Sequence, residues 1–148
     1  MDKPFTILLV EDDENDVLLI TRAFKKHYLD KPLHVARNGE DGRAYLSGEG
    51  KYSDRQKYPF PDVVITDLKM PKMSGMELLA WLAEHQELRV IPTIMMSASK
   101  EDKDVARAYE LGANTYMVKP ADSDTLAQMV KLIRDYWAMS TKPGREEI

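Results

Sequence analysis

The sequence predicts an α/β fold in which a doubly wound parallel sheet has helices on both faces. Five short apolar runs, each bounded by turn residues, alternate with segments long enough for helices, and this alternation is typical of parallel sheets. The runs ILLV, VVI and TIMM are almost continuously apolar, as expected for strands that are covered on both sides. The predicted strands are Phe5–Val10, Leu33–Ala36, Asp62–Thr66, Thr93–Met96 and Thr115–Val118.

Composition limits the classes of protein to which the chain can belong. Its 148 residues are the usual size of one domain. Its formal net charge of −4 is not that of a dedicated nucleic-acid binder, which is usually basic. The absence of cysteine excludes disulfides, thiolate metal sites and cysteine nucleophiles. No apolar stretch approaches the about 20 residues that span a bilayer, and the N-terminus does not have the pattern of a secretory signal. We therefore expect a cytoplasmic protein that binds neither membrane nor nucleic acid.

Capping signals and apolar periodicity predict helices between the strands. Ser74 and Glu77 have the spacing of a capping box, which predicts a helix through MELLAWLAEH. Ser99 is placed to cap a helix over about 101–111, and Gly112 lies where a left-handed C-terminal residue is favoured. The last helix has the clearest apolar stripe. Its residues are Leu126, Met129, Val130, Ile133 and Trp137.

The first two helices have weaker signals, and two segments fit neither strand nor helix. Asp13 is placed to cap the first helix, and the second is expected over Glu40–Leu46. The segment Gly48–Pro61 has the composition of a loop, at a length where loops are often functional. We expect the tail over residues 140–148 to be mobile. The inner face of the first helix is predicted to be Val17, Ile20, Thr21 and Phe24.

Acidic, hydroxyl or ammonium side chains directly follow four of the predicted strands, and the second strand is followed only by Arg37 and Asn38. In an open parallel sheet the functional crevice lies beyond the carboxyl ends of the strands, so these side chains are expected to converge there. Glu11, Asp12 and Asp13 follow the first strand. The residues after the third, fourth and fifth strands are Asp67, Ser97 and Lys119.

This set of side chains indicates phosphoryl chemistry assisted by a metal. Carboxylates that are packed together repel one another and require a cation or protons, and oxygen ligands favour a hard ion, most often Mg²⁺. A carboxylate held beside Mg²⁺ and an ammonium group can act as a nucleophile on phosphorus and form an aspartyl phosphate. The hydroxyl of Ser97 could donate a hydrogen bond to one oxygen of the incoming group.

The motifs VEDD, ITDLKMPKMSG, MMSAS and GANTYMVKP, in this order, resemble the receiver domain of two-component response regulators. The resemblance runs from about Phe5 to Trp137. It implies a flavodoxin-like sheet of five strands in the order 2-1-3-4-5, with a receiver domain over residues 1–139 and no output domain. The segment over residues 48–61 and the opening VEDDENDVLL are similar to small regulators paired with phytochrome-type histidine kinases.

The resemblance also implies a role for each residue of the predicted site. Asp67 matches the phosphoacceptor, Asp12 a direct Mg²⁺ ligand and Glu11 an acid that acts on the metal through water. Lys69 would lend its backbone carbonyl to the metal. Ser97 and Lys119 match the hydroxyl and the lysine that bind the phosphoryl group, Tyr116 matches the aromatic switch, and the bond between Lys119 and Pro120 would be cis.

The family mechanism implies two protein partners. A sensor histidine kinase would donate the phosphoryl group to Asp67, after which Ser97 moves toward it and Tyr116 turns inward. The surface of the fourth helix, fifth strand and fifth helix would then change its partner preference, and we expect a homodimer through this surface. The same switch is a two-state equilibrium biased by local charge.

Departures from the common family pattern and competing functions remain open at this point. Ala121 stands where an aromatic is frequent, Ala98 leaves the site open, and Lys69 replaces a small polar residue. Phosphatases that use an aspartate nucleophile usually carry a second acid at the position of Lys69, so we expect no turnover of exogenous phosphomonoesters. A scaffold that is never phosphorylated is the other alternative. Without the rest of the set, Ser97 would be a helix-entry residue and Tyr116 a half-exposed strand residue.

Overall fold

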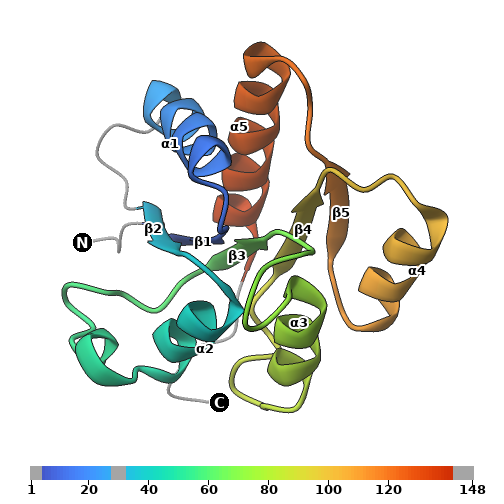
Figure 1. Ribbon diagram of the computed structural model, residues 1–148. Helices are drawn as coiled ribbons and strands as arrows, with labels where there is room; N and C mark the ends of the chain where they lie inside the picture. The colour runs from blue at the N-terminus through green and yellow to red at the C-terminus, as the bar shows by residue number, and fades with distance from the viewer. Residues whose placement is uncertain (1–4, 28–32, 142–148) are drawn as a thin grey trace.

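The computed structural model describes residues 5–27 and 33–141, which form one parallel sheet covered by helices on both faces (Figure 1). The strands are β1 (Ile7–Val10), β2 (Leu33–Ala36), β3 (Val63–Thr66), β4 (Thr93–Ser97) and β5 (Thr115–Val118). The helices are α1 (Glu14–His27), α2 (Gly39–Ser47), α3 (Gly75–Ala83), α4 (Asp102–Glu110) and α5 (Ser123–Met139), with a 3₁₀ turn η1 (Gly50–Ser53). The strand order is β2-β1-β3-β4-β5, which confirms the predicted fold.

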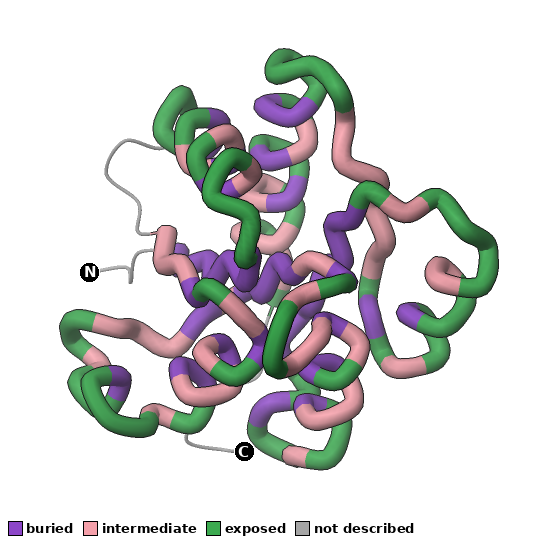
Figure 2. The backbone as a smooth tube through the Cα atoms, in the orientation of Figure 1, coloured by how far each residue is buried: buried purple, intermediate pink, exposed green. Residues whose placement is uncertain are grey.

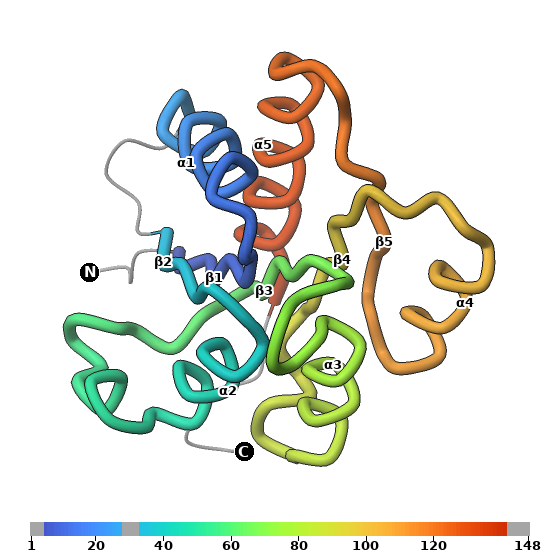
Figure 3. Tube along the Cα trace, viewed as in Figure 1, coloured from blue at the N-terminus to red at the C-terminus, as the bar shows by residue number. Residues whose placement is uncertain are grey.

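The register of the sheet aligns the carboxyl ends of its central strands. Val10 of β1 lies beside Ala36 of β2 and Thr66 of β3. Two backbone hydrogen bonds continue this ladder by one step, because Glu11 N donates to Ala36 O at 2.9 Å and Asp67 N donates to Val10 O at 3.0 Å. Glu11 and Asp67 therefore leave the sheet at the same level and side by side. Figure 3 shows the neighbouring strands β1 and β3 from which they follow.

Both faces of the sheet are buried, which explains why its strands are continuously apolar. Ile7, Leu9 and Ile65 pack against α1 and α5, whereas Leu8, Val10 and Val64 pack toward α2 and α3. In Figure 2 the central strands accordingly form a buried band between helices whose outer sides are exposed. None of the helices among residues 5–27 and 33–141 is long and apolar enough to cross a bilayer.

The predicted caps of α1 and α3 are confirmed, but the predicted cap of α4 is wrong. Asp13 Oδ1 accepts a hydrogen bond from Asp16 N, and Ser74 and Glu77 form both bonds of the capping box. Glu101, not Ser99, stands at the N-cap position of α4. The Ser99 hydroxyl instead donates to Asp104 at 2.6 Å, inside the first turn, and this bond holds it two residues ahead of the helix.

Alanines replace two larger residues in the predicted inner faces of the helices on one side of the sheet. Ala23 is buried on α1 where Thr21 was predicted, and Ala127 is buried on α5 while Met129 is only half-buried. These small side chains lie in the same core cluster. The apolar stripes are thus wider than the large residues alone predicted, because alanine contributes to a packed face without standing out in the sequence pattern.

The segment over residues 48–61 is structured, contrary to the expectation of a loop without secondary structure. It contains η1, and Tyr52 is buried with its ring 4.9 Å from that of Tyr45 and 5.0 Å from that of Tyr58. Arg55 donates hydrogen bonds to the carbonyls of Tyr45 and Leu46, at the C-terminal end of α2. Aromatic packing and the hydrogen bonds of Arg55 to the end of α2 hold this segment in a defined conformation, which its turn-rich composition did not predict. The predicted mobile tail lies almost wholly outside the described residues, which end at 141.

Candidate functional site

Lys119 is the centre of the polar cluster at the carboxyl ends of the strands. Its Nζ donates hydrogen bonds to Glu11 Oε1 at 2.7 Å, to Asp16 Oδ2 at 2.7 Å and to Asp67 Oδ2 at 3.0 Å. These partners come from the end of β1, the first turn of α1 and the end of β3, while Lys119 follows β5. The predicted convergence of Glu11, Asp67 and Lys119 on one edge is therefore seen in the structure.

Three carboxylates beside this lysine have the geometry of a cation site. Glu11, Asp12 and Asp67 each offer an oxygen, and these oxygens lie within 4.8 Å of one another. Glu11 is 1% exposed, Asp67 is half-buried and Asp12 is exposed, so the cluster is closed on the side of the sheet and open to water at Asp12. An all-oxygen set with one open side suits a hard divalent ion that keeps several waters.

Burial and mutual repulsion make it unfavourable for all the carboxylates of this cluster to be ionised without a bound cation. Burial raises the pKa of the Glu11 carboxyl to about 7, although hydrogen bonds from Lys119 and Asp13 N oppose the rise, and the charge of Asp67 adds to it. Burial alone would lower the pKa of Lys119, but the hydrogen bonds to its three carboxylates outweigh burial and raise that pKa above its ordinary range. Lys119 is thus protonated at neutral pH. The protonation of Glu11 depends on the nearby charges, including any cation bound at the site.

The loop after β3 fixes the backbone of Asp67 by close contact. Asp67 Oδ1 accepts a hydrogen bond from Leu68 N at 2.6 Å, and Gly75 N donates to Leu68 O at 2.9 Å. A Cβ atom at Gly75 would collide with the Asp67 carbonyl, so only glycine permits α3 to begin this close to the acid. The loop also contains Lys72 at φ +68°, a backbone conformation that non-glycine residues rarely adopt.

An open cavity of about 550 Å³ lies beside Asp67, on the side of β4. Asp67 and Ser97 line it from two neighbouring strands, and Lys69 and Lys100 are exposed residues of its wall. Ser97 is 4% exposed, and its hydroxyl oxygen accepts a hydrogen bond from Ser99 N at 3.2 Å. The Asp67 carboxylate, the Ser97 hydroxyl and the side chains of Lys69, Lys100 and Glu101 thus line a cavity that is open to solvent.

Comparison with known proteins supports what this geometry indicates. The model of the response regulator receiver domain family matches residues 7–131. The chain belongs to the response regulator receiver domain family. It is 34% identical to the response regulator Rcp1 of Synechocystis sp. (strain ATCC 27184 / PCC 6803 / Kazusa), over 90% of this chain and 89% of Rcp1.

Solved structures of related receiver domains have the same fold over almost the whole chain. The phosphorylated cyanobacterial phytochrome response regulator RcpA superimposes with a TM-score of 0.86 at 33% identity, covering 96% of this chain and 100% of that one. The Mn²⁺-bound form of Rcp1 gives a TM-score of 0.82 at 33% identity, with 95% and 100% covered. This receiver domain is therefore a homologue of phytochrome response regulators and a member of a signalling family.

Tyr116 of this receiver domain lies in an inward position. Its hydroxyl donates to Ser99 O at 2.9 Å, and its ring packs against the buried cluster that contains Leu68 and Met95. The backbone N–H of Tyr116, on the edge strand β5, donates to the hydroxyl of Tyr109 on α4 at 3.0 Å. The sequence did not indicate this second tyrosine as part of the site, since a residue on an exposed helix face is usually solvated.

Two further findings differ from the expectations for this receiver domain. The bond between Lys119 and Pro120 is trans, so the predicted cis peptide is wrong for this structure; Lys119 reaches all three carboxylates with the isomer that is favoured before proline. Asp16, which the sequence patterns did not single out, is a direct partner of Lys119. Its position in the first turn of α1, next to the end of β1, was the only hint that it could reach the carboxyl ends of the strands.

Proposed function

We propose that this receiver domain accepts a phosphoryl group on Asp67 from the phosphohistidine of a sensor histidine kinase, in a Mg²⁺-dependent reaction. The observation that carries the proposal is the convergence of Glu11, Asp12, Asp67 and Lys119 at one edge of the sheet. A hard divalent cation would be held by Asp12 and Asp67 directly, by the Lys69 backbone carbonyl and by Glu11 through water. The Mn²⁺-bound form of the homologue Rcp1 supports a divalent cation in the family.

The chemistry assigns each side chain a part. An Asp67 carboxylate oxygen attacks phosphorus, an O–P bond forms, and the P–N bond to the histidine breaks, with the electron pair leaving on the imidazole. A cation held by Asp12 and Asp67 would supply positive charge to neutralise the phosphoryl oxygens. Lys119 Nζ, already 3.0 Å from Asp67 Oδ2, holds one oxygen of the transferred group, and the Ser97 hydroxyl donates to another.

The switch would pass through Ser97 to Tyr116. The backbone of Ser99 links Ser97 to Tyr116. Ser99 N donates to Ser97 Oγ, and Ser99 O accepts from the Tyr116 hydroxyl. Tyr116 is thus already in the inward position that the family mechanism assigns to the phosphorylated state, and movement of Ser97 toward a phosphoryl group would act on the segment that holds it there. The two positions of the switch are the two states that phosphorylation would bias.

The donor is proposed to be a phytochrome-type histidine kinase in the cytoplasm. The homologue RcpA is a cyanobacterial phytochrome response regulator, and the opening VEDDENDVLL and the segment over residues 48–61 of this chain are the features that resemble such regulators. Phosphotransfer from a panel of purified histidine kinases, with Asp67→Asn as control, tests both points. Transfer to the wild type from no kinase in the panel, together with no response to beryllofluoride and Mg²⁺, would favour a scaffold that is not phosphorylated.

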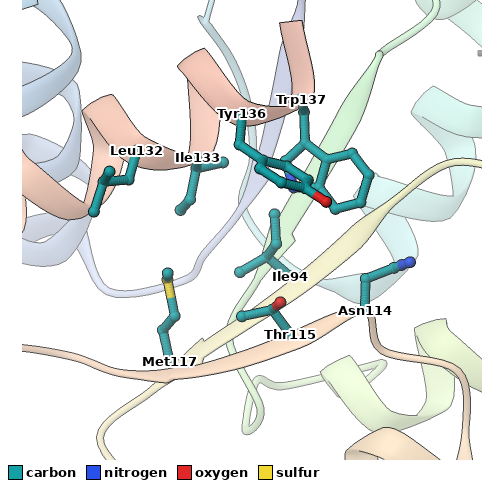
Figure 4. Close-up of a pocket in the computed structure, with 8 residues that line it drawn as sticks. All are labelled: Ile94, Asn114, Thr115, Met117, Leu132, Ile133, Tyr136 and Trp137. Carbon is teal, nitrogen blue, oxygen red and sulfur yellow. The ribbon is translucent and has the colours of Figure 1, made fainter. Parts of the chain in front are cut away.

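We also propose a homodimer through α4, β5 and α5. A mainly apolar groove of about 370 Å³ lies between α5 and the strands β4 and β5. Figure 4 shows Ile94 and Met117 on its strand side and Ile133 on its α5 side. Leu132 and Tyr136 on its wall are 64% and 65% exposed, an unusual amount of apolar surface for one helix. A monomeric mass at micromolar concentration, with and without beryllofluoride, would contradict this proposal; Leu132→Glu should abolish a dimer if one forms.

Turnover of free phosphomonoesters is not part of the proposed function. Lys69, an exposed lysine on the cavity wall, stands two residues after the nucleophile, where the related phosphatases need a general acid/base. An ammonium group has no lone pair and therefore cannot act as the general base of that step. Sustained release of phosphate from an aryl phosphate, far above one equivalent per Asp67, would contradict this.

A further inference from the structure

Asp16 is a polar side chain of the site that the proposed reaction leaves without a role. Its Oδ2 atom accepts a hydrogen bond from Lys119 Nζ at 2.7 Å, and the two residues are 103 positions apart. Its side chain is 30% exposed and that of Lys119 is 15% exposed, so the pair is partly shielded from water. Any role of this pair in signalling rests on the proposed phosphoryl transfer to Asp67, because Lys119 must be held in place for that reaction.

Every hydrogen-bond donor of the Lys119 ammonium has a carboxylate partner. An ammonium group has three N–H donors, and the three acceptors are Glu11 at 2.7 Å, Asp16 at 2.7 Å and Asp67 at 3.0 Å. The longest of these bonds goes to the proposed phosphoacceptor. A phosphoryl oxygen on Asp67 can therefore replace Oδ2 as the third acceptor while the other two bonds stay in place.

Asp16 differs from the other two partners in its relation to the metal site. The oxygens within 4.8 Å of one another come from Glu11, Asp12 and Asp67, and Asp16 does not contribute to this group. A cation bound there draws on both Glu11 and Asp67, and thus competes with Lys119 for them. Asp16 is the partner that has no such competition, and it can hold the ammonium in place when the cation is bound.

We propose that Asp16 is a positioning residue that fixes Lys119 for the phosphoryl group, separately from the metal site. A purely structural role is the alternative, because Asp16 lies in the first turn of α1, where an acid favours the helix dipole. Glu14 lies in the same turn, is exposed, and has the same charge. Glu14→Gln is therefore the matched control: it removes the same charge from the same turn but no contact with Lys119.

The test separates binding of the metal from binding of the phosphoryl analogue. Wild type, Asp16→Ala, Asp16→Asn and Glu14→Gln are titrated first with Mg²⁺ alone, by calorimetry, and then with beryllofluoride in saturating Mg²⁺. We expect Asp16→Ala to weaken beryllofluoride binding about tenfold, in line with the loss of a charge-assisted hydrogen bond. Asp16→Asn should lose less, since its amide oxygen still accepts from Lys119. Mg²⁺ affinity should stay within about threefold of wild type in all variants, because Asp16 lies outside the metal group.

Three results would overturn the proposal. Tighter beryllofluoride binding by Asp16→Ala and Asp16→Asn would mean that Asp16 repels the anion more than it positions the lysine. Equal binding by all four proteins would leave Asp16 a helix residue only. An equal loss of Mg²⁺ and beryllofluoride affinity would place Asp16 in the metal site. Wild type that binds Mg²⁺ but not beryllofluoride would instead contradict the proposed function itself, so the two failures are distinguishable.

Discussion

Two polar clusters, one at the carboxyl ends of the strands (the carboxyl edge) and one near their amino ends, differ in their balance of charge. At the carboxyl edge, Lys119 is one cation among the carboxylates of Glu11, Asp12, Asp16 and Asp67, so negative charge is in excess. The segment over residues 48–61 leads into the amino end of β3, at the opposite edge. There Arg55 has carbonyl acceptors and the rings of Tyr45 and Phe60 around it, at 5.7 and 5.4 Å.

The difference indicates that the cluster around Lys119 binds a ligand and that the cluster around Arg55 is structural. Arg55 Nη1 and Nη2 donate to the backbone carbonyls of Tyr45, Tyr58 and Leu46, as expected of a structural cluster. The carboxyl edge is left short of positive charge, and a partly buried set of this kind is completed by a cation or by protons. Function should therefore respond strongly to changes at the carboxyl edge and weakly to changes in the segment over residues 48–61, whose effects should be confined to stability.

Asp67→Asn is expected to have the largest functional effect. An amide cannot form the O–P bond, so phosphotransfer should fall to background, while the free energy of unfolding changes by no more than about 1 kcal/mol because a repulsive charge is removed together with the contact to Lys119. Phosphotransfer and denaturant unfolding of the same preparation measure the two quantities. Phosphorylation that persists in this variant would assign the acceptor to another residue.

The pH dependence of stability should reveal the charge imbalance of the carboxyl edge. Because the pKa of Glu11 is raised from 4.5 to about 7 in the folded protein, its protonated form stabilises the fold at low pH, and this contribution is lost as pH rises from about 4.5 through about 7. The loss is on the order of 3 kcal/mol. Saturating Mg²⁺ should reduce it, since the cation takes the place of the proton.

Glu11→Gln is the control for this pH dependence. It removes the titrating group at the same buried position, so stability without Mg²⁺ should vary less between pH 5 and pH 7, an interval that follows from the shifted pKa. Thermal unfolding at several pH values, with and without Mg²⁺, measures it. An identical pH profile in wild type and variant would show that Glu11 is ionised throughout this range.

Arg55→Ala should have a smaller effect, confined to stability. The variant removes hydrogen bonds of 2.8 and 3.0 Å from the carbonyls of Tyr45 and Leu46 at the end of α2, which should cost about 2 kcal/mol. Phosphotransfer to Asp67 should stay within a factor of two of wild type. Arg55→Lys keeps the charge but not the paired donors, and should recover less than half of the loss. A large change in phosphotransfer would show that the two edges are coupled.

The contrast between the edges also explains what the sequence could predict. The strands and their parallel register were predictable from apolar runs, and register alone brings Glu11 and Asp67 together, since each is the first residue after a central strand. Contacts that depend on side-chain rotamers across elements were not predictable: the bond from Lys119 to Asp16, and the bond from the Tyr116 backbone to Tyr109. The packing around Arg55 was likewise not predictable from the turn-rich composition of its segment, because Arg55 bonds to carbonyls of α2.

Lys69→Asn should have the smallest effect, on the lifetime of the phosphorylated form. Lys69 is exposed on the wall of the cavity beside Asp67, where its ammonium can contact a phosphoryl oxygen and shield it from water. A single exposed charge is worth about 0.5–1 kcal/mol, so dephosphorylation should accelerate about two- to fivefold. Lys72→Asn is the matched control: it removes an exposed lysine of the same loop that does not line this cavity, and asparagine tolerates the positive φ of that position. Equal lifetimes for wild type, Lys69→Asn and Lys72→Asn, measured by loss of the phosphorylated species over time, would show that the Lys69 ammonium points to solvent and that Asp67 is protected by Lys119 and the metal site alone.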